Sequence, residues 1–352
     1  MRLAFEAVSY SYVGGDAAKK RGRKKQRERQ ADWGNAPDAL WALRDVSLTV
    51  EPGEFLGVAG HTGSGKSTLI QHMNGLVHPT CGRVTADGAD LAEKEVASRV
   101  RSQVGLVFQY PENQLFANTV YDDVAFGPRN MKLDEAEVDR RVREAMELVG
   151  LDLDAIGERS PFDLSGGQQR RVAFAGVLAM EPELLVLDEP VAGLDPLSRA
   201  DFLALIARFH ARGMTVVMVS HSMEDLAALS DRILVLSEGR VFALGTPAQV
   251  FADAASLKAV GLGAPAPQAF ASSLRDAGFS LPRELYDETS LAVDLAAQLA
   301  ASAPNADGAA AVAAEAAAEA ESAGEAETAS TEDASCGAPN ADASTRAGDR
   351  RG

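Results

Sequence analysis

The fold of this chain is decided by the stretch Gly60-His61-Thr62-Gly63-Ser64-Gly65-Lys66-Ser67-Thr68. It follows the short aliphatic run 55–59 and opens a segment with helical spacing, so it predicts a tight loop between a buried strand and a helix. Glycines let backbone N–H groups curl around phosphate oxygens, and a helix N-terminus adds partial positive charge. Lys66 is then placed to reach the β- and γ-phosphates of a nucleotide, and the Ser67 hydroxyl to ligate Mg²⁺. The alternative is a glycine-rich turn before an ordinary helix, which the strand and helix on either side disfavour.

Around this loop the chain alternates short aliphatic runs with longer amphipathic segments. The runs 184–187 and 215–219, like 55–59, are typical of buried strands in a mainly parallel sheet. Residues 232–236 and 241–244 resemble the two strands of a hairpin joined by Ser-Glu-Gly-Arg. Helical spacing extends over 67–77, 134–149, 168–180 and 198–212. This alternation predicts an α/β layer fold.

A second element places two carboxylates at the end of a strand. It reads Leu184-Leu185-Val186-Leu187-Asp188-Glu189-Pro190, and ligands of open α/β sheets bind at the carboxyl ends of the strands. We expect Asp188 to act on Mg²⁺ and its water shell, and Glu189 to position or deprotonate the attacking water at a γ-phosphate. A strand that ends in solvated acids is the alternative, and the preceding phosphate loop disfavours it.

Composition limits the class of protein. The chain has 352 residues, of which 46% are hydrophobic, enough for one large domain with appendages or for two domains. Its formal net charge of −17 argues against a general nucleic-acid binder. Only two cysteines are present and no CxxC pair, so we expect neither a structural zinc site nor a disulfide scaffold. The absence of a long apolar run and of a signal-peptide core leads us to expect a soluble cytoplasmic protein.

Two segments depart from this globular pattern. Residues 16–36 carry eight Lys/Arg against three acidic residues and are predicted to form a solvated basic loop. The alternative for this loop is contact with anionic lipid headgroups. Residues 303–352 are rich in Ala and Glu and acidic, and they are predicted to form a disordered tail that acts as a spacer.

A third motif points to a family. Leu164-Ser165-Gly166-Gly167-Gln168 precedes Asp188 by about 20 residues and is followed by Gln169-Arg170-Arg171. With this motif, residues 1–265 resemble the ATPase subunit of an ATP-binding cassette (ABC) transporter. The resemblance implies a P-loop NTPase core with a mainly parallel sheet and an antiparallel β subdomain. It also implies a helical subdomain over about 110–180 that carries the LSGGQ motif.

The resemblance also assigns roles to further residues. Tyr12 stands where the family stacks an aromatic ring on adenine, although the basic insertion weakens this placement and an ordinary strand tyrosine is the alternative. Gln109 matches the glutamine that ligates Mg²⁺ and senses the membrane partner. Asp195 lies in the loop Gly193-Leu194-Asp195, which couples the two sites of a dimer, and His221 matches the histidine that contacts the γ-phosphate.

Together these roles describe a composite ATP site. One subunit holds Mg-ATP through its loop Gly60–Thr68 and supplies the catalytic residues Glu189, His221 and Gln109. The other subunit clamps the γ-phosphate with Ser165 and Gly167. The remaining nucleotide-binding residues that the resemblance assigns are Gly166, Gln168 and Asp195. The Mg²⁺ ligands are expected to be Ser67, Gln109 and Asp188. Val191 departs from the family's usual threonine, at a position without a catalytic role.

The subfamily is indicated by four further motifs, which resemble the ATPases of energy-coupling-factor (ECF) transporters. They are Gly60-His61-Thr62-Gly63-Ser64-Gly65, Pro111-Glu112-Asn113-Gln114-Leu115-Phe116, Ala125-Phe126-Gly127-Pro128 and Ala175-Gly176-Val177-Leu178-Ala179-Met180. Thr62 and Pro161-Phe162-Asp163 are more similar to the second of the two ATPase types. The resemblance implies ATP-driven uptake of a vitamin or a transition-metal ion at the cytoplasmic face of the cell membrane.

The partners implied by this resemblance are a transmembrane coupling subunit, a substrate-binding membrane subunit and a second ATPase. The second ATPase is either another copy of the chain or a sister ABC ATPase, and no nucleic acid is expected. A short helical extension, 266–302, would help to hold the ATPase dimer together. The surface around 109–116 would receive a helix of the transmembrane partner, with Leu115 and Phe116 as exposed anchors or, alternatively, as ordinary core residues.

Two other functions are open to the same motifs. One is the ATPase of a binding-protein-dependent importer or of an exporter. The other is a soluble ABC ATPase acting in DNA repair or translation. The second is disfavoured because the chain has one cassette, no heptad arm and no CxxC pair.

Overall fold

The computed structural model describes residues 1–12, 41–282, 285–286 and 288–302. The segments predicted as a basic loop, 16–36, and as a tail, 303–352, lie outside the described residues.

The central sheet is six-stranded and mainly parallel, as predicted. Its strand order is β10-β9-β3-β8-β7-β6, and only the edge strand β10 runs antiparallel to its neighbour. The strands span Arg240–Gly245 (β10), Arg232–Ser237 (β9), Phe55–Gly60 (β3), Thr215–Val219 (β8), Leu184–Asp188 (β7) and Val104–Val107 (β6). All residues of β3 and β8 are buried, which explains their continuous aliphatic sequence. The predicted strands and the hairpin are confirmed.

A second sheet is entirely antiparallel, with the order β2-β1-β4-β5. Its strands span Leu43–Val50 (β2), Leu3–Tyr10 (β1), Cys81–Ala86 (β4) and Ala89–Asp90 (β5). Leu3, Phe5 and Leu48 point into a core that this sheet shares with one face of the central sheet. This is the antiparallel β subdomain that the resemblance implied.

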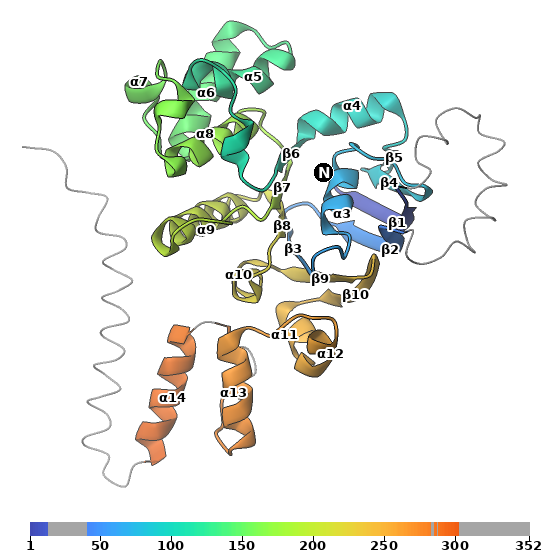
Figure 1. The fold of residues 1–352 in the computed structure, drawn as a ribbon, viewed down its shortest axis with the longest axis vertical. Coiled ribbons are helices and arrows are strands. Elements are labelled where there is room, and N and C mark those ends of the chain that lie inside the picture. The colour runs from blue at the N-terminus through green and yellow to red at the C-terminus, as the bar shows by residue number, and fades with distance from the viewer. Residues whose placement is uncertain (13–40, 283–284, 287, 303–352) are drawn as a thin grey trace, which may run out of the picture.

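The α5–α8 group of helices lies at one end of the molecule (Figure 1). The helices and 3-10 turns span Lys66–Met73 (α3), Lys94–Gln103 (α4), Pro111–Gln114 (η2), Val120–Asn130 (α5), Glu135–Leu148 (α6), Leu153–Ile156 (α7), Pro161–Asp163 (η3), Gly166–Leu178 (α8), Pro196–Ala211 (α9), Met223–Leu229 (α10), Pro247–Phe251 (α11), Ala254–Ala259 (α12), Ala266–Asp276 (α13) and Glu288–Ser302 (α14). All four predicted helical segments are helical. The first is shorter than predicted, because the chain turns at Asn74 and at Gly75, whose φ is +68°.

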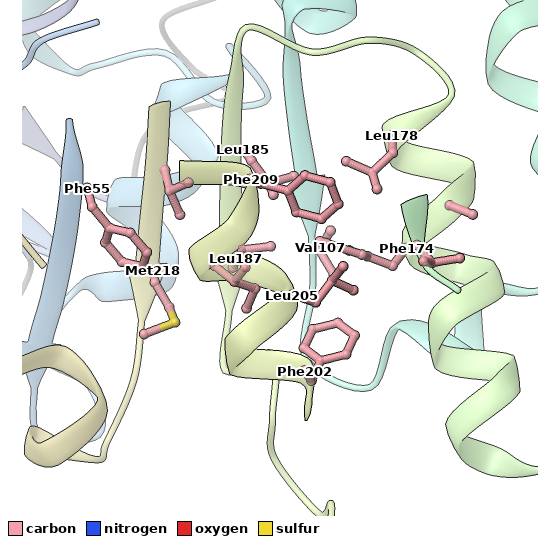
Figure 2. Close-up of a cluster of buried hydrophobic side chains, with 14 of the residues drawn as sticks. Phe55, Val107, Phe174, Leu178, Leu185, Leu187, Phe202, Leu205, Phe209 and Met218 are labelled. Carbon is pink, nitrogen blue, oxygen red and sulfur yellow. The ribbon is translucent and has the colours of Figure 1, made fainter. Parts of the chain in front are cut away.

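The larger core fixes α8 and α9 against one face of the central sheet (Figure 2). Phe202 and Phe209 of α9 flank Phe174 of α8, with ring centroids 5.1 Å and 5.9 Å from that of Phe174. Leu185 and Leu187 of β7 lie in the same cluster. The strand that ends in Asp188-Glu189 is therefore packed rigidly against the helix that begins after the LSGGQ serine.

The two C-terminal helices α13 and α14 have a small core of their own. Ala271, Leu281, Leu285 and Leu291 form it. Both helices fall within the range predicted for the helical extension.

Candidate nucleotide-binding site

Four parallel strands of the central sheet end at one edge, and the predicted catalytic segments follow them. Val219 pairs with Val58 of β3 on one side and with Asp188 of β7 on the other. The backbone N–H of Glu189 donates to Val219 O at 3.0 Å, so the chain leaves β7 still bound to β8. This edge therefore collects the Lys66 loop, the Asp188-Glu189 pair, and the segments that carry Gln109 and His221.

The loop after β3 is closed around its own lysine. Lys66 Nζ donates to the carbonyl oxygens of Gly60, at 2.7 Å, and His61, at 3.1 Å. A β-carbon at Gly65, where φ is +104°, would lie 2.5 Å from Ala42 O, so only glycine fits. Burial lowers the pKa of Lys66, although the carboxylates of Glu189 and Asp188 act in the opposite direction. A lysine held among carbonyls and acids is ready to exchange those partners for phosphate oxygens.

Asp188 and Ser67 place two oxygen atoms that could bind Mg²⁺ next to each other. The Ser67 hydroxyl donates to Asp188 Oδ2 at 3.4 Å. Burial raises the pKa of Asp188, against the hydrogen bond from Ser67 and the charge of Lys66. Carboxylate and hydroxyl oxygens are the ligands that Mg²⁺ prefers, usually together with substrate phosphates. The residues present thus fit a magnesium nucleotide.

Glu189 is the most perturbed acid of the edge. Burial raises its pKa to about 7, the neighbouring Asp188 adds to this rise, and a backbone hydrogen bond from His221 opposes it. Its backbone adopts a left-handed φ of 50°. Among the described residues, its buried Oε1 has no hydrogen-bond partner. A carboxylate that titrates near neutral pH, with an oxygen whose only close polar neighbour is the imidazole of His221 among the described residues, suits the role of base toward a water molecule.

His221 faces this carboxylate. Its Nε2 lies 3.3 Å from Glu189 Oε1, and more than half of its side chain is exposed. Burial of the ring and the charge of Lys66 lower the pKa of His221, while Asp188 acts against them. The imidazole is therefore neutral near pH 7, and it can donate or accept one hydrogen bond at a γ-phosphate.

Gln109 and Tyr12 lie at the margins of the site. Gln109 is exposed, two residues beyond the end of β6. The Tyr12 hydroxyl is 3.0 Å from the Thr68 hydroxyl, and its ring meets Tyr10 edge to face at 5.0 Å. Tyr12 is thus held beside α3, the helix that follows the phosphate loop. Its stacking on adenine and the contact of Gln109 with Mg²⁺ stay predictions.

The LSGGQ residues are well ordered but lie elsewhere. Ser165 caps α8 by accepting from the Gln168 N–H at 3.3 Å, and Gln168 Oε1 accepts from the Ser165 N–H at 3.1 Å. Gly166 and Gly167 are exposed, and a β-carbon at either would meet nothing within 4 Å. Figure 1 shows α8 among α5–α8, across the strands from α3. The structure therefore does not bring these residues to the Lys66 loop of the same chain.

Asp195 is likewise exposed, at the start of α9. It accepts hydrogen bonds from the Ser198 N–H, at 3.0 Å, and from the Ser198 hydroxyl, at 2.6 Å. These bonds lower the pKa of Asp195. Its carboxylate stays ionised, with its position fixed on the surface.

One expectation about the 109–116 surface is wrong in part. Phe116 is 58% exposed and meets Phe126 edge to face at 4.9 Å, but Leu115 is only 6% exposed and belongs to the main core. The chain leaves η2 in an extended conformation at Leu115. Neighbouring side chains of an extended segment point to opposite sides, so only one of the two can face solvent.

Sequence reasoning missed two partly buried ionic contacts around the site. Arg170 of α8 binds Glu112 of η2, and Arg199 of α9 binds Asp225 of α10 through both carboxylate oxygens at 2.6 Å and 2.7 Å. The only signal was an arginine placed shortly after a motif, without any indication of its partner.

The fold and the edge together define an ABC-type ATPase. The sequence profile described as "ABC transporter" matches residues 43–192. "Energy-coupling factor transporter ATP-binding protein EcfA2" of Symbiobacterium thermophilum is 56% identical over 286 residues, which cover 81% of this chain and 92% of that protein. The protein of the same name from Latilactobacillus sakei is 42% identical over 316 residues, 87% of this chain and 100% of its own length. The chain belongs to the family of energy-coupling-factor transporter ATP-binding proteins, as its motifs indicated.

Solved structures support the same assignment. The cbiO1 protein of Clostridium perfringens, described as part of the ABC transporter complex cbiONQ, superposes with a TM-score of 0.60 at 34% identity, covering 74% of this chain and 94% of cbiO1. The ATP-binding cassette MJ0796, solved as a dimer in a post-hydrolysis state with ADP and Pi, gives a TM-score of 0.55 at 26% identity over 69% and 98% of the two chains. Among the helices described in this structure, none is long and apolar enough to cross a bilayer.

Proposed function

We propose that this chain is the ATP-hydrolysing subunit of an ECF-type importer, and that it couples ATP binding and hydrolysis to uptake of a vitamin or a transition-metal ion. The observation that carries the proposal is the convergence of Lys66, Asp188, Glu189 and His221 at one sheet edge, together with an LSGGQ helix that lies away from it. Such a chain holds a nucleotide by itself and needs a second ATPase to complete the site.

The chemistry follows from the groups at the edge. On nucleotide binding, Lys66 exchanges the carbonyls of Gly60 and His61 for phosphate oxygens. Ser67, Asp188 and Gln109 would hold Mg²⁺, which supplies neutralisation of the phosphate charge when bound. Glu189 accepts a proton from water as the water oxygen bonds to the γ-phosphorus and the bond from that phosphorus to the β,γ-bridging oxygen breaks.

The second ATPase contributes the LSGGQ segment and Asp195 in trans. ATP then bridges two subunits, and hydrolysis releases them. This partner is a second copy of the chain or a sister ABC ATPase. The exposed state of Ser165 and Gly167 at the capped start of α8 supports this arrangement, because it leaves both residues open to a second subunit.

Membrane partners complete the proposal. A transmembrane coupling subunit would dock on the surface next to η2, where Phe116 and Phe126 present an apolar pair. Contact with that subunit and with a substrate-binding membrane subunit would hold the chain peripherally at the cytoplasmic face of the membrane.

The experiment is purification of the full-length tagged chain in mild detergent from its own cells. Expected results are co-purifying membrane subunits and release of phosphate from Mg-ATP by the complex. If the chain releases phosphate but brings down no multi-span membrane protein, the importer role is refuted while the ATPase activity stands. If no phosphate release is found in the complex, the hydrolytic role is refuted.

A further inference from the structure

Arg170 occupies an unusual position for a charged side chain. It lies on α8, five residues after Ser165, and its side chain is only 4% exposed. A guanidinium is costly to bury unless its N–H groups are matched by acceptors. Each hydrogen bond that Arg170 makes therefore offsets part of the cost of burying its charge.

The contacts of Arg170 reach two separate segments. Nε and one terminal nitrogen donate to the two carboxylate oxygens of Glu112, at 2.9 Å and 2.8 Å. The other terminal nitrogen donates to the backbone carbonyls of Pro190, at 3.3 Å, and Ala192, at 3.0 Å. One planar group thus joins the η2 turn, the LSGGQ helix and the segment that begins directly after Glu189.

The carboxylate end of this link is held firmly. Burial works to raise the pKa of Glu112, but the hydrogen bonds and charge of Arg170 outweigh it and lower this pKa. Two parallel N–H···O bonds fix the relative orientation of both planes as well as their distance. The η2 turn cannot rotate without moving Arg170.

A second contact ties the same two segments. Tyr110 caps η2 with a left-handed φ of 57°. A β-carbon at Gly193, where φ is +76°, would lie 3.3 Å from Cε1 of the Tyr110 ring, so the ring packs directly over the backbone of the loop that leads to Asp195. The segment 190–193 is therefore held at three points, two by Arg170 of α8 and one by Tyr110 at the start of η2.

We propose that Arg170 is a positioning residue that transmits movement of the η2 turn to Glu189 and Asp195 through the carbonyls of Pro190 and Ala192. The proposal rests on the proposed function, in which a membrane subunit docks beside η2. Displacement of η2 then changes the placement of the base and of the coupling loop together, and the start of α8 moves with them. Docking of the membrane subunit beside η2 is thereby coupled to ATP hydrolysis at the sheet edge.

The test uses the purified transporter complex with three variants of the full chain. Arg170→Lys keeps the charge but loses the fork that binds Glu112 and both carbonyls. Glu112→Gln keeps the volume but loses the charge and one acceptor. Arg171→Lys is the matched control, since Arg171 is the next residue of the same helix and binds Val149 O at 2.9 Å, away from η2 and 190–193.

We expect Arg170→Lys and Glu112→Gln to lower kcat for ATP hydrolysis at least tenfold while KM for ATP stays within about threefold of the parent. The amount of substrate transported per ATP should fall in both variants as well. Arg171→Lys should leave all three quantities unchanged. A merely structural role would instead lower kcat and raise KM together, in proportion to a fall in melting temperature.

Three results overturn the proposal. The first is a kcat within twofold of the parent in both Glu112→Gln and Arg170→Lys, and the second is a proportional loss of kcat, ATP affinity and melting temperature in both variants. The third is a loss of kcat in Arg171→Lys equal to that in Arg170→Lys. The parent complex is assayed in parallel. A parent without hydrolysis refutes the proposed function instead, so the two failures are distinguishable.

Discussion

Replacement of Glu189 by Gln tests the central chemical assignment. The amide keeps the shape of the side chain but cannot accept a proton from water. Loss of a general base lowers rates by about 10²- to 10⁴-fold. We therefore expect Glu189→Gln to bind Mg-ATP and to release phosphate at least 100-fold more slowly than the parent, as measured by phosphate release under saturating ATP.

The raised pKa of Glu189 adds a signature that a structural residue lacks. With a pKa of about 7, only about a tenth of the parent side chains are ionised one pH unit below that value. The parent kcat/KM for ATP, which reports ionisation of the free enzyme, should therefore rise about fivefold between pH 6 and pH 7 and level off above pH 8. The residual rate of Glu189→Gln should lack this step.

The same pKa predicts a change in stability. Folding raises the pKa of Glu189 from 4.5 to about 7, so the folded state binds the proton more tightly, and its stability falls as pH rises through this window. At 1.36 kcal/mol per unit, the parent loses up to about 3 kcal/mol that Glu189→Gln does not lose. Without nucleotide, the variant should melt close to the parent at pH 5 and several degrees above it at pH 8.

A matched control and a clear refutation complete the experiment. Glu147→Gln removes the same charge from an exposed position on α6 and should change neither kcat nor the melting temperature. Glu189→Gln should also accumulate as a dimer with Mg-ATP, but not with Mg-ADP, by light scattering with a sister ATPase supplied where one co-purifies. Hydrolysis near the parent rate would refute the role of Glu189. A dead variant that stays monomeric with every partner would refute ATP as the bridge.

Three further predictions concern separate parts of the molecule. Lys66→Ala should abolish the rise in melting temperature on adding Mg-ATP, because no other cation replaces it in the loop; an unchanged rise contradicts the assignment. Phe116→Ser combined with Phe126→Ser should leave the melting temperature within a few degrees and hydrolysis by the ATPase dimer without its membrane subunits unchanged, since both rings are exposed. Uptake in vesicles should fall strongly, and unfolding would show that the two phenylalanines are core residues. Phe202→Ala should cost about 3–5 kcal/mol in urea unfolding because it opens the α8–α9 core, and a loss below 1 kcal/mol would show that this packing is dispensable.

The sequence predicts those parts of the fold whose cause is local. Local sequence is enough to predict the strands β3, β7 and β8 and the glycine-rich loop before Lys66. Hydrophobic periodicity and backbone freedom depend only on neighbouring residues. The burial of Leu115 was not predictable in this way. It depends on the extended backbone after η2 and on the core that Leu115 shares with residues of α5 and α8.

Polar contacts between residues far apart in the chain could not be predicted from the sequence. Glu112 and Arg170 are 58 positions apart, and nothing in either local sequence names the other as partner. Arg170 also bonds to two backbone carbonyls, which every residue possesses, so no residue type marks those acceptors. Such contacts become visible only once α8, η2 and the end of β7 are placed together.

The placement of Glu189 shows how the core supports an unfavourable site. A left-handed backbone at a non-glycine residue costs roughly 1–3 kcal/mol, and burial of the Glu189 carboxylate is unfavourable as well. They persist because β7 is fixed on both sides by β6 and β8 and packed below by the aromatic rings of α8 and α9. The stability of the fold thus holds Glu189 in the unfavourable position that its proposed role as base requires. Arg170 binds the segment directly after this carboxylate, so in the proposed coupling a movement of η2 reaches the strained residue Glu189 through Pro190 and Ala192.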